Sequence, residues 1–205
     1  MADKNSIKII KEFKGSNLKL KLNELKSVIV KGPSYPDLSE IYNSALEIKK
    51  LSAQIDEIVH AAGIIQCLPR ILKKGEKVID LSLASGADGE GIDLITDKRI
   101  AEFKFARWQE SKANGMRKRQ VFADLVNLYL HPTTKSKELY VFNVEKIKRF
   151  FESKKATWKN VLSKSGGLDN RLEEYLNSKK ITGQFLNDVY SISNVSIYDL
   201  DEILK

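Results

Sequence analysis

The chain of 205 residues has a single cysteine, Cys67, which lies within an apolar segment. One cysteine cannot form an intramolecular disulfide, so a disulfide-stapled fold of the kind found in small secreted proteins is excluded. Core packing is the ordinary role of such a residue. We therefore expect a reducing compartment and predict a cytoplasmic location.

Long apolar runs are also missing. No stretch approaches the roughly 18 residues of a membrane-spanning helix, and no N-terminal segment has the uninterrupted apolar core of a signal peptide. Hydrophobic residues still make up 42% of the chain, enough to bury a substantial core. These features predict a globular protein with no membrane partner.

Two common kinds of site leave no signature in the sequence. The glycine-rich segment 84–91 lacks the Gly-Lys-Ser/Thr of a phosphate-cradling loop, and no cluster has the spacing of zinc ligands. Nucleotide hydrolysis and a structural zinc are therefore not indicated. No internal repeat is visible either.

Positive charge is in excess. Lys and Arg number 35 against 27 Asp and Glu, which makes the net charge +8. The excess is concentrated, because residues 1–32 hold eight Lys against three acids and residues 145–164 hold seven basic residues against two acids. Such a balance favours an anionic partner such as nucleic acid, and a basic but otherwise neutral surface is the alternative.

The pattern predicts three parts. Residues 1–36 form a basic N-terminal arm, residues 37–145 form the core, and residues 146–205 form a mostly helical extension packed on the core. Within the arm, Asn17–Leu22 and Ser27–Val30 have the pattern of two short strands, or of a strand and a frayed helix.

The segment from Leu38 to Leu68 has the periodicity of one helix, for which Ser39 is a plausible N-cap. Its predicted apolar stripe consists of Ile41, Ala45, Ile48, Ile55, Val59 and Ala62. A second face holds Ala53, Glu57, His60 and Ile64. Because that face mixes apolar side chains with an acid and an imidazole, we expect it to look into a cleft.

Two apolar runs, Ile92–Ile95 and Ile100–Phe105, flank the polar residues 96–99, which is the pattern of a β-hairpin. This register pairs Ile95 with Ile100 and Leu94 with Ala101, and so places Asp93 opposite Glu102. Directly opposed carboxylates repel each other, which suggests that something positive lies between them.

Alternation along the strand puts Lys104 on the same side as Glu102, whereas Phe103 and Phe105 project to the other side. Carboxylate oxygens suit a hard cation such as Mg²⁺, which keeps several of its waters. The lysine could act on a water or a phosphate beside that metal.

The run from Gly91-Ile92-Asp93 to Glu102-Phe103-Lys104 resembles the signature of the PD-(D/E)XK nuclease superfamily, the restriction-endonuclease-like fold. In that family an Asp on one strand and a Glu-x-Lys on the next bind the metal and act on a phosphodiester. Ile92 stands where the motif's name has proline. The expected order of elements also agrees, because the chain predicts an α/β protein with an α-β-β-β-α-β core and a central mixed sheet flanked by helices.

The resemblance implies roles for particular residues. Asp93, Glu102 and the backbone carbonyl of Phe103 would hold Mg²⁺, for which Mn²⁺ could substitute, and Lys104 would orient or deprotonate the attacking water. Glu57 is the candidate for the helix glutamate that often completes the site, and a surface glutamate is the alternative.

A second set of residues predicts nucleic-acid contacts: Arg107, Arg117, Lys118, Arg119 and Gln120. Phosphate binding by the basic residues is the functional interpretation, and salt bridges to nearby acids are the alternative. The helix that contains the last four should bury Val121, Phe122, Leu125, Leu128 and Tyr129. In several nucleases of the superfamily a Gln-x-x-x-Tyr motif begins at such a glutamine, but here Asp124 replaces the tyrosine.

These features predict a metal-dependent endonuclease of the restriction or repair type that cuts DNA rather than RNA, and two copies could form a homodimer. One rival is a catalytically silent nucleic-acid-binding module on the same fold. Another is a structural interaction protein in which Lys104 only neutralises Glu102.

Overall fold

The structure is a computed structural model that describes residues 4–14, 18–31, 37–52, 55–82, 91–107 and 114–205. The chain divides into two compact units, Met1–Ile58 and Val59–Lys205. The sequence analysis divided the chain after residues 36 and 145, into an arm, a core and an extension. The structure's own division falls within a helix, between Ile58 and Val59, and each unit is described by itself below.

The first unit is helical in its described parts. Helices α1 (Lys4–Lys14) and α2 (Leu18–Lys31) occupy the arm, and α3 (Ser39–Ser52) packs against α1. The strands expected in the arm are therefore wrong. The Leu-Lys alternation at residues 18–22 imitates the period of a strand, but Leu and Lys are both strong helix formers, and neither Gly nor Pro interrupts α2.

The helix expected over Leu38–Leu68 is two helices, α3 and α4 (Ile55–Ile71), and residues 53 and 54 lie outside the described part of the chain. Asp37 caps α3, because its carboxylate accepts from the backbone N–H of Ser39 at 2.9 Å and from its hydroxyl at 2.6 Å. Ser39, the expected N-cap, is thus the partner of the capping side chain.

The expected apolar stripe is also wrong for α4. Ile55, Val59 and Ala62 are exposed, whereas Ile64 and Cys67 are fully buried. The face with His60 and Ile64, which the sequence assigned to a cleft, is the one that packs against the sheet. The sheet presents both apolar side chains and polar atoms to this face.

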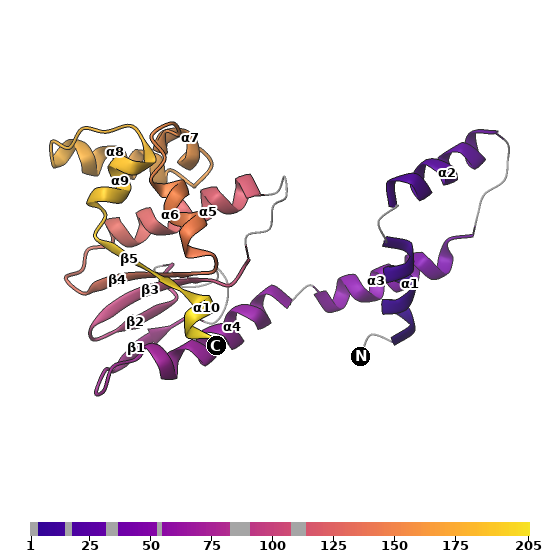
Figure 1. Ribbon diagram of the computed structural model, residues 1–205, viewed down its shortest axis with the longest axis horizontal. Coiled ribbons are helices and arrows are strands. Elements are labelled where there is room, and N and C mark those ends of the chain that lie inside the picture. The colour runs from indigo at the N-terminus through magenta and orange to yellow at the C-terminus, as the bar shows by residue number, and fades with distance from the viewer. Residues whose placement is uncertain (1–3, 15–17, 32–36, 53–54, 83–90, 108–113) are drawn as a thin grey trace. The chain divides into compact units, whose positions relative to one another are not determined.

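The second unit is built on a five-stranded mixed sheet with the order β1-β2-β3-β4-β5 (Figure 1). Its strands are β1 (Val78–Leu81), β2 (Leu94–Thr96), β3 (Arg99–Lys104), β4 (Ser136–Val141) and β5 (Val195–Asp199). The pairs β1–β2 and β2–β3 are antiparallel, and β3–β4 and β4–β5 are parallel. The α/β class and the mixed sheet are confirmed, with α4, β1, β2, β3, α5 and β4 in the predicted chain order.

Helices cover both faces of this sheet. Helix α5 (Asn114–Leu130) lies on one face with α6 (Val144–Phe151), α7 (Trp158–Leu162), α8 (Leu168–Ser178) and α9 (Leu186–Ile192), and α4 lies on the other (Figure 1). A short α10 (Leu200–Ile203) follows β5. The stripe expected on α5 is confirmed, because all five of its apolar side chains are buried. None of the described helices is long and apolar enough to cross a membrane.

The turn end of the hairpin β2–β3 is held by a buried ion-pair network around Arg99. Its guanidinium donates to both carboxylate oxygens of Glu76 and to Glu138, each at 2.7 Å. Thr96 donates to Glu76 at 2.7 Å, and Tyr140 donates to Glu138 at 2.6 Å. The hydrogen bonds from Arg99 hold the pKa of Glu76 down at about 2. Each acid in this network therefore has its own donors.

Candidate active site

The hairpin has the predicted register. Leu94 pairs with Ala101 and Ile95 pairs with Ile100, with Asp97-Lys98 as the loop. The hydroxyl of Thr96 closes the turn by accepting from the backbone N–H groups of residues 98 and 99, at 3.0 and 2.9 Å. Because this register is maintained, the residue before β2 meets the middle of β3.

Asp93 is that residue, and its side chain is close to both β3 and α4. One oxygen, Oδ2, accepts from the backbone N–H of Phe103 at 2.8 Å. The other, Oδ1, lies 3.2 Å from Nε2 of His60 on α4. Only 8% of the residue is exposed. The carboxylate is thus held between the sheet and the helix that covers it.

Glu102 lies beside Asp93 and is even more buried, with 4% of the residue exposed. Burial raises the pKa of Glu102 well above its usual value, and the charges of Asp93 and Asp124 raise it further, whereas Lys104 opposes the change. Strand β3 thus places the carboxyl group of Glu102 where its ionisation is unfavourable.

Lys104 projects to the same side as Glu102, as the alternation predicted. Its ammonium nitrogen lies 3.6 Å from Oε2 of Glu102 and 3.1 Å from Oδ2 of Asp124 on α5. Burial lowers the pKa of Lys104, but the charges of Asp124, Glu102 and Asp93 outweigh burial and raise the pKa overall. The lysine is therefore charged and shared between two acids.

Asp124 is a member of the cluster whose role the sequence did not reveal. It stands among the buried apolar residues of α5, and burial raises its pKa against the opposing charge of Lys104. Neither its Oδ2 nor Nε2 of His60 completes a hydrogen bond of good geometry in the described part of the chain. An acid within an apolar helical stripe was the available signal, whereas the motif marks this position only as a replaced tyrosine.

The cluster carries more acid than base. Asp93, Glu102 and Asp124 provide three carboxyl groups against the one ammonium of Lys104 and the imidazole of His60. Burial strengthens every interaction among these groups, because the local dielectric is low. The site is therefore a buried cluster in which acidic groups outnumber basic ones. Nevertheless, among the described residues no three or more His, Cys, Asp or Glu side chains are already grouped as a metal site.

The remaining predicted metal residues have different surroundings. Phe103 lies in β3 between the two charged residues, and its side chain is buried on the opposite face against Tyr140, with a centroid separation of 4.7 Å. Glu57 lies in the first turn of α4, within the other compact unit, and it is exposed. The helix residue that reaches Asp93 is His60, three positions later.

The predicted phosphate contacts begin with Arg107, which is engaged within the protein. Its guanidinium lies 2.7 Å from the carboxylate of Asp201 and 4.2 Å from the centroid of the Phe142 ring. Arg117 donates to the backbone carbonyl of Arg107 at 3.1 Å. The alternative interpretation, a salt bridge to a nearby acid, thus describes Arg107.

The other three residues of this set lie in the first half of α5. The ammonium of Lys118 is 5.5 Å from the centroid of the Phe150 ring. Arg119 is half-buried and Gln120 is exposed. Their contacts leave the prediction of nucleic-acid binding open.

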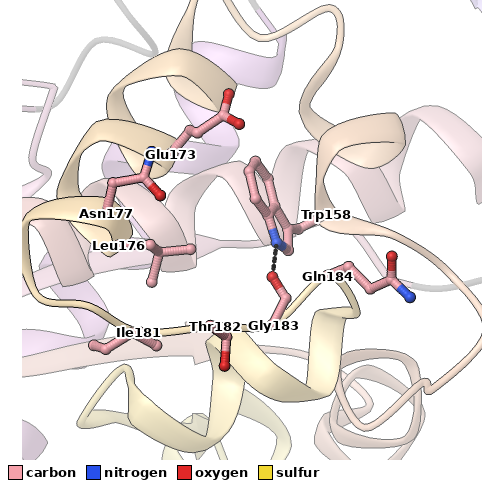
Figure 2. Close-up of a pocket in the computed structure, with 8 residues that line it drawn as sticks. All are labelled: Trp158, Glu173, Leu176, Asn177, Ile181, Thr182, Gly183 and Gln184. Atoms are coloured by element: carbon pink, nitrogen blue, oxygen red, sulfur yellow. Dashed lines mark hydrogen bonds between the residues drawn. The ribbon is translucent and has the colours of Figure 1, made fainter.

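A separate surface hollow lies between α7, α8 and residues 181–184 (Figure 2). Trp158 forms part of its wall and donates its indole N–H to the carbonyl of Gly183 at 3.0 Å. Glu173, the acid that lines it, lies 2.6 Å from the ammonium of Lys159. Because this charge is already paired, the carboxylate cluster on β3 is the stronger candidate for a site.

Comparisons with protein-family models, with curated proteins and with solved structures returned no match for this chain. The resemblance to the PD-(D/E)XK superfamily therefore remains a prediction from the motif.

Proposed function

We propose that the chain is a metal-dependent nuclease that hydrolyses phosphodiester bonds of DNA. The observation that carries the proposal is the buried surplus of acid around Asp93 and Glu102, next to the ammonium of Lys104. Opposed buried carboxyls destabilise a sheet, so a fold that keeps them has a use for them.

The residues present fit Mg²⁺ as the cation. Mg²⁺ is commonly bound by one or two carboxylates and keeps several waters, so Asp93 and Glu102 suffice without a third acidic ligand. When bound, the ion would stabilise negative charge on the phosphoryl oxygens and lower the pKa of a water. Mn²⁺ has the same preference for oxygen ligands and could substitute.

The chain's own residues would divide the remaining work. Phe103 N–H and His60 hold the two oxygens of Asp93, which positions that carboxylate. Asp124 and Glu102 hold the ammonium of Lys104 between them. Because the charges around it raise the pKa of Lys104, its role in the metal-free protein is electrostatic: a cation that attracts a phosphate and orients a water.

The net charge of +8 supports a polyanionic substrate, since phosphate contacts supply most of the affinity in such complexes. Arg117, Lys118 and Arg119 at the start of α5 are the proposed phosphate contacts near the cluster.

The direct test is a cleavage assay with and without Mg²⁺, on plasmid, linear, single-stranded and branched DNA and on RNA. We expect Mg²⁺-dependent cleavage of at least one DNA substrate and its loss in Asp93→Asn and Glu102→Gln. Asp80→Asn is the matched control, because Asp80 is an exposed acid on β1 of the same sheet. Full activity in both site variants would refute the proposal. DNA binding with no cleavage of any substrate would instead favour the silent binding module.

Lys104 variants separate the two roles of the lysine. Lys104→Ala should lower the cleavage rate about 100-fold or more, because it removes the charge beside the reacting phosphate. Lys104→Arg keeps a charge that cannot act as a base. Substantial activity in the arginine variant would exclude the base role, and no activity would favour it.

A further inference from the structure

Lys104 lies closer to an acid on another element than to the acid on its own strand. Its ammonium nitrogen is 3.1 Å from Oδ2 of Asp124 on α5 and 3.6 Å from Oε2 of Glu102 on β3. A separation of 3.6 Å is too long for a hydrogen bond, so the contact with Glu102 is only electrostatic. Asp124 is therefore the main partner of the lysine.

Helix α5 holds Asp124 in a fixed place. Its neighbours Phe122, Leu125 and Val126 are fully buried in the core on that face of the sheet, and α5 contains no other acid. The side chain of Asp124 is itself only 16% exposed. Groups carried on packed helices are positioned more precisely than groups on loops. Asp124 thus provides a fixed anchor for a long and flexible lysine side chain.

Without this anchor, the ammonium would have Glu102 as its next carboxylate, only 3.6 Å away. A lysine side chain has enough rotatable bonds to close that gap. An ammonium in direct contact with Glu102 would occupy an oxygen that the proposed cation needs. It would also repel that cation strongly, because the site is buried and the local dielectric is low.

We infer that Asp124 is a positioning residue, which holds the Lys104 ammonium off Glu102 and so leaves an oxygen of Glu102 open to Mg²⁺ or Mn²⁺. This role rests on the proposed function, because it concerns the affinity of the same site for its cation. Asp124 touches neither metal nor substrate in this role. Because it acts only through Lys104, its effect on metal affinity should vanish when the lysine is removed.

The test is a double-mutant cycle in which metal binding to the full chain is measured. Isothermal titration calorimetry with Mn²⁺, without nucleic acid, compares the wild type, Asp124→Asn, Lys104→Met and the double variant. We expect Asp124→Asn alone to weaken binding about 10-fold or more, as changes next to a metal ligand commonly do. In the Lys104→Met background the same change should alter the affinity less than about 2-fold, because no ammonium remains to contact Glu102.

Glu138→Gln is the matched control for a general loss of stability. Glu138 is also a buried acid of this sheet, but its cationic partner is Arg99. Its removal should therefore leave the metal affinity at the wild-type value. Circular dichroism checks that each variant is folded. If Asp124→Asn does not fold, Asp124→Ser replaces it in both backgrounds, since serine is smaller and still polar.

Equal losses from Asp124→Asn in the two backgrounds would overturn the inference, because Asp124 would then act without Lys104. A loss of the same size in Glu138→Gln would also overturn it, since reduced stability would explain both. If Asp124→Asn bound Mn²⁺ as tightly as the wild type, the positioning role would be wrong and the nuclease proposal would stand. A wild type that bound neither Mn²⁺ nor Mg²⁺ would refute both.

Discussion

Two buried charged clusters lie on the same sheet, and they shift the pKa values of their acids in opposite directions. Around Arg99, both Glu76 and Glu138 receive short hydrogen bonds from the guanidinium. Around Lys104, three acids act on one ammonium, whose nearest carboxylate oxygen is 3.1 Å away. The pKa of Glu76 is lowered to about 2, whereas the pKa of Glu102 is raised.

The difference separates structure from function. A satisfied network holds its shape and has no further need of a ligand, as expected for the Arg99 cluster at the turn. An acidic cluster with too few donors is destabilising, and under the proposed function a bound cation would relieve that cost at the Lys104 cluster. Burial alone would not distinguish the clusters, because Arg99 and Glu102 are equally buried, at 4% exposed each.

The largest expected effect is on stability, and it contrasts the two central cations. Arg99→Met leaves the buried carboxylates of Glu76 and Glu138 without their positively charged partner, so it should lower the free energy of unfolding by about 3–5 kcal/mol. Lys104→Met should cost much less, because the raised pKa of Glu102 and of Asp124 lets either take up a proton instead. Urea unfolding at neutral pH measures both. Equal losses would show that the clusters are alike.

A second contrast concerns metal. Mg²⁺ or Mn²⁺ at 100 times its dissociation constant should stabilise the wild type by about 2.7 kcal/mol, since it binds only the folded site. Asp93→Asn should abolish the rise in melting temperature. Glu76→Gln should show the same rise as the wild type, although its melting temperature without metal is lower. The measurement is a thermal melt over a metal titration. No shift in the wild type would argue against a metal site at Asp93.

The smallest effect is a difference in pH dependence. Because the folded pKa of Glu102 is raised, the folded state holds its proton longer, and stability falls as pH rises above the usual glutamate value of 4.5. Glu102→Gln removes this loss. The variant should therefore gain stability over the metal-free wild type as the pH rises, by at most about 1.4 kcal/mol per pH unit.

Glu76 should behave with the opposite sign. Its lowered pKa contributes stability that is present above pH 4.5 and is lost as the pH falls toward 2. Glu76→Gln should thus be destabilising at neutral pH, and its difference from the wild type should shrink in acid. Chemical unfolding between pH 3 and 8 tests both variants. The same sign for both would contradict the assigned environments.

Short-range pattern predicted the hairpin well. The turn Asp97-Lys98 and the pairing of Leu94 with Ala101 depend on residues within one β-hairpin, where the alternation of side chains leaves one register with a buried face. The positions of Glu102 and Lys104 on a common side follow from that register alone. The buried stripe of α5 was equally predictable, because its period is helical and its apolar residues are large.

The same kind of reasoning failed in the N-terminal region. The alternation at Leu18–Leu22 fits a strand and a helix, and only the continuous helix α2 resolves it. On α4 the sequence offered two candidate faces, and the one with more apolar residues is exposed. Periodicity identifies faces on a helix, but it cannot say which face meets the sheet.

By itself, therefore, the sequence determined the α/β order of elements and the pairing of Asp93 with Glu102 and Lys104, because neighbours in one hairpin constrain each other directly. Tertiary structure alone decided that Asp124 from α5 and His60 from α4 join them. Those residues are distant along the chain, and the sequence placed His60 only on a helix face and Asp124 only at the position of the motif's tyrosine. His60 contacts Asp93 and Asp124 contacts Lys104, because the helices that carry them cover opposite faces of the sheet.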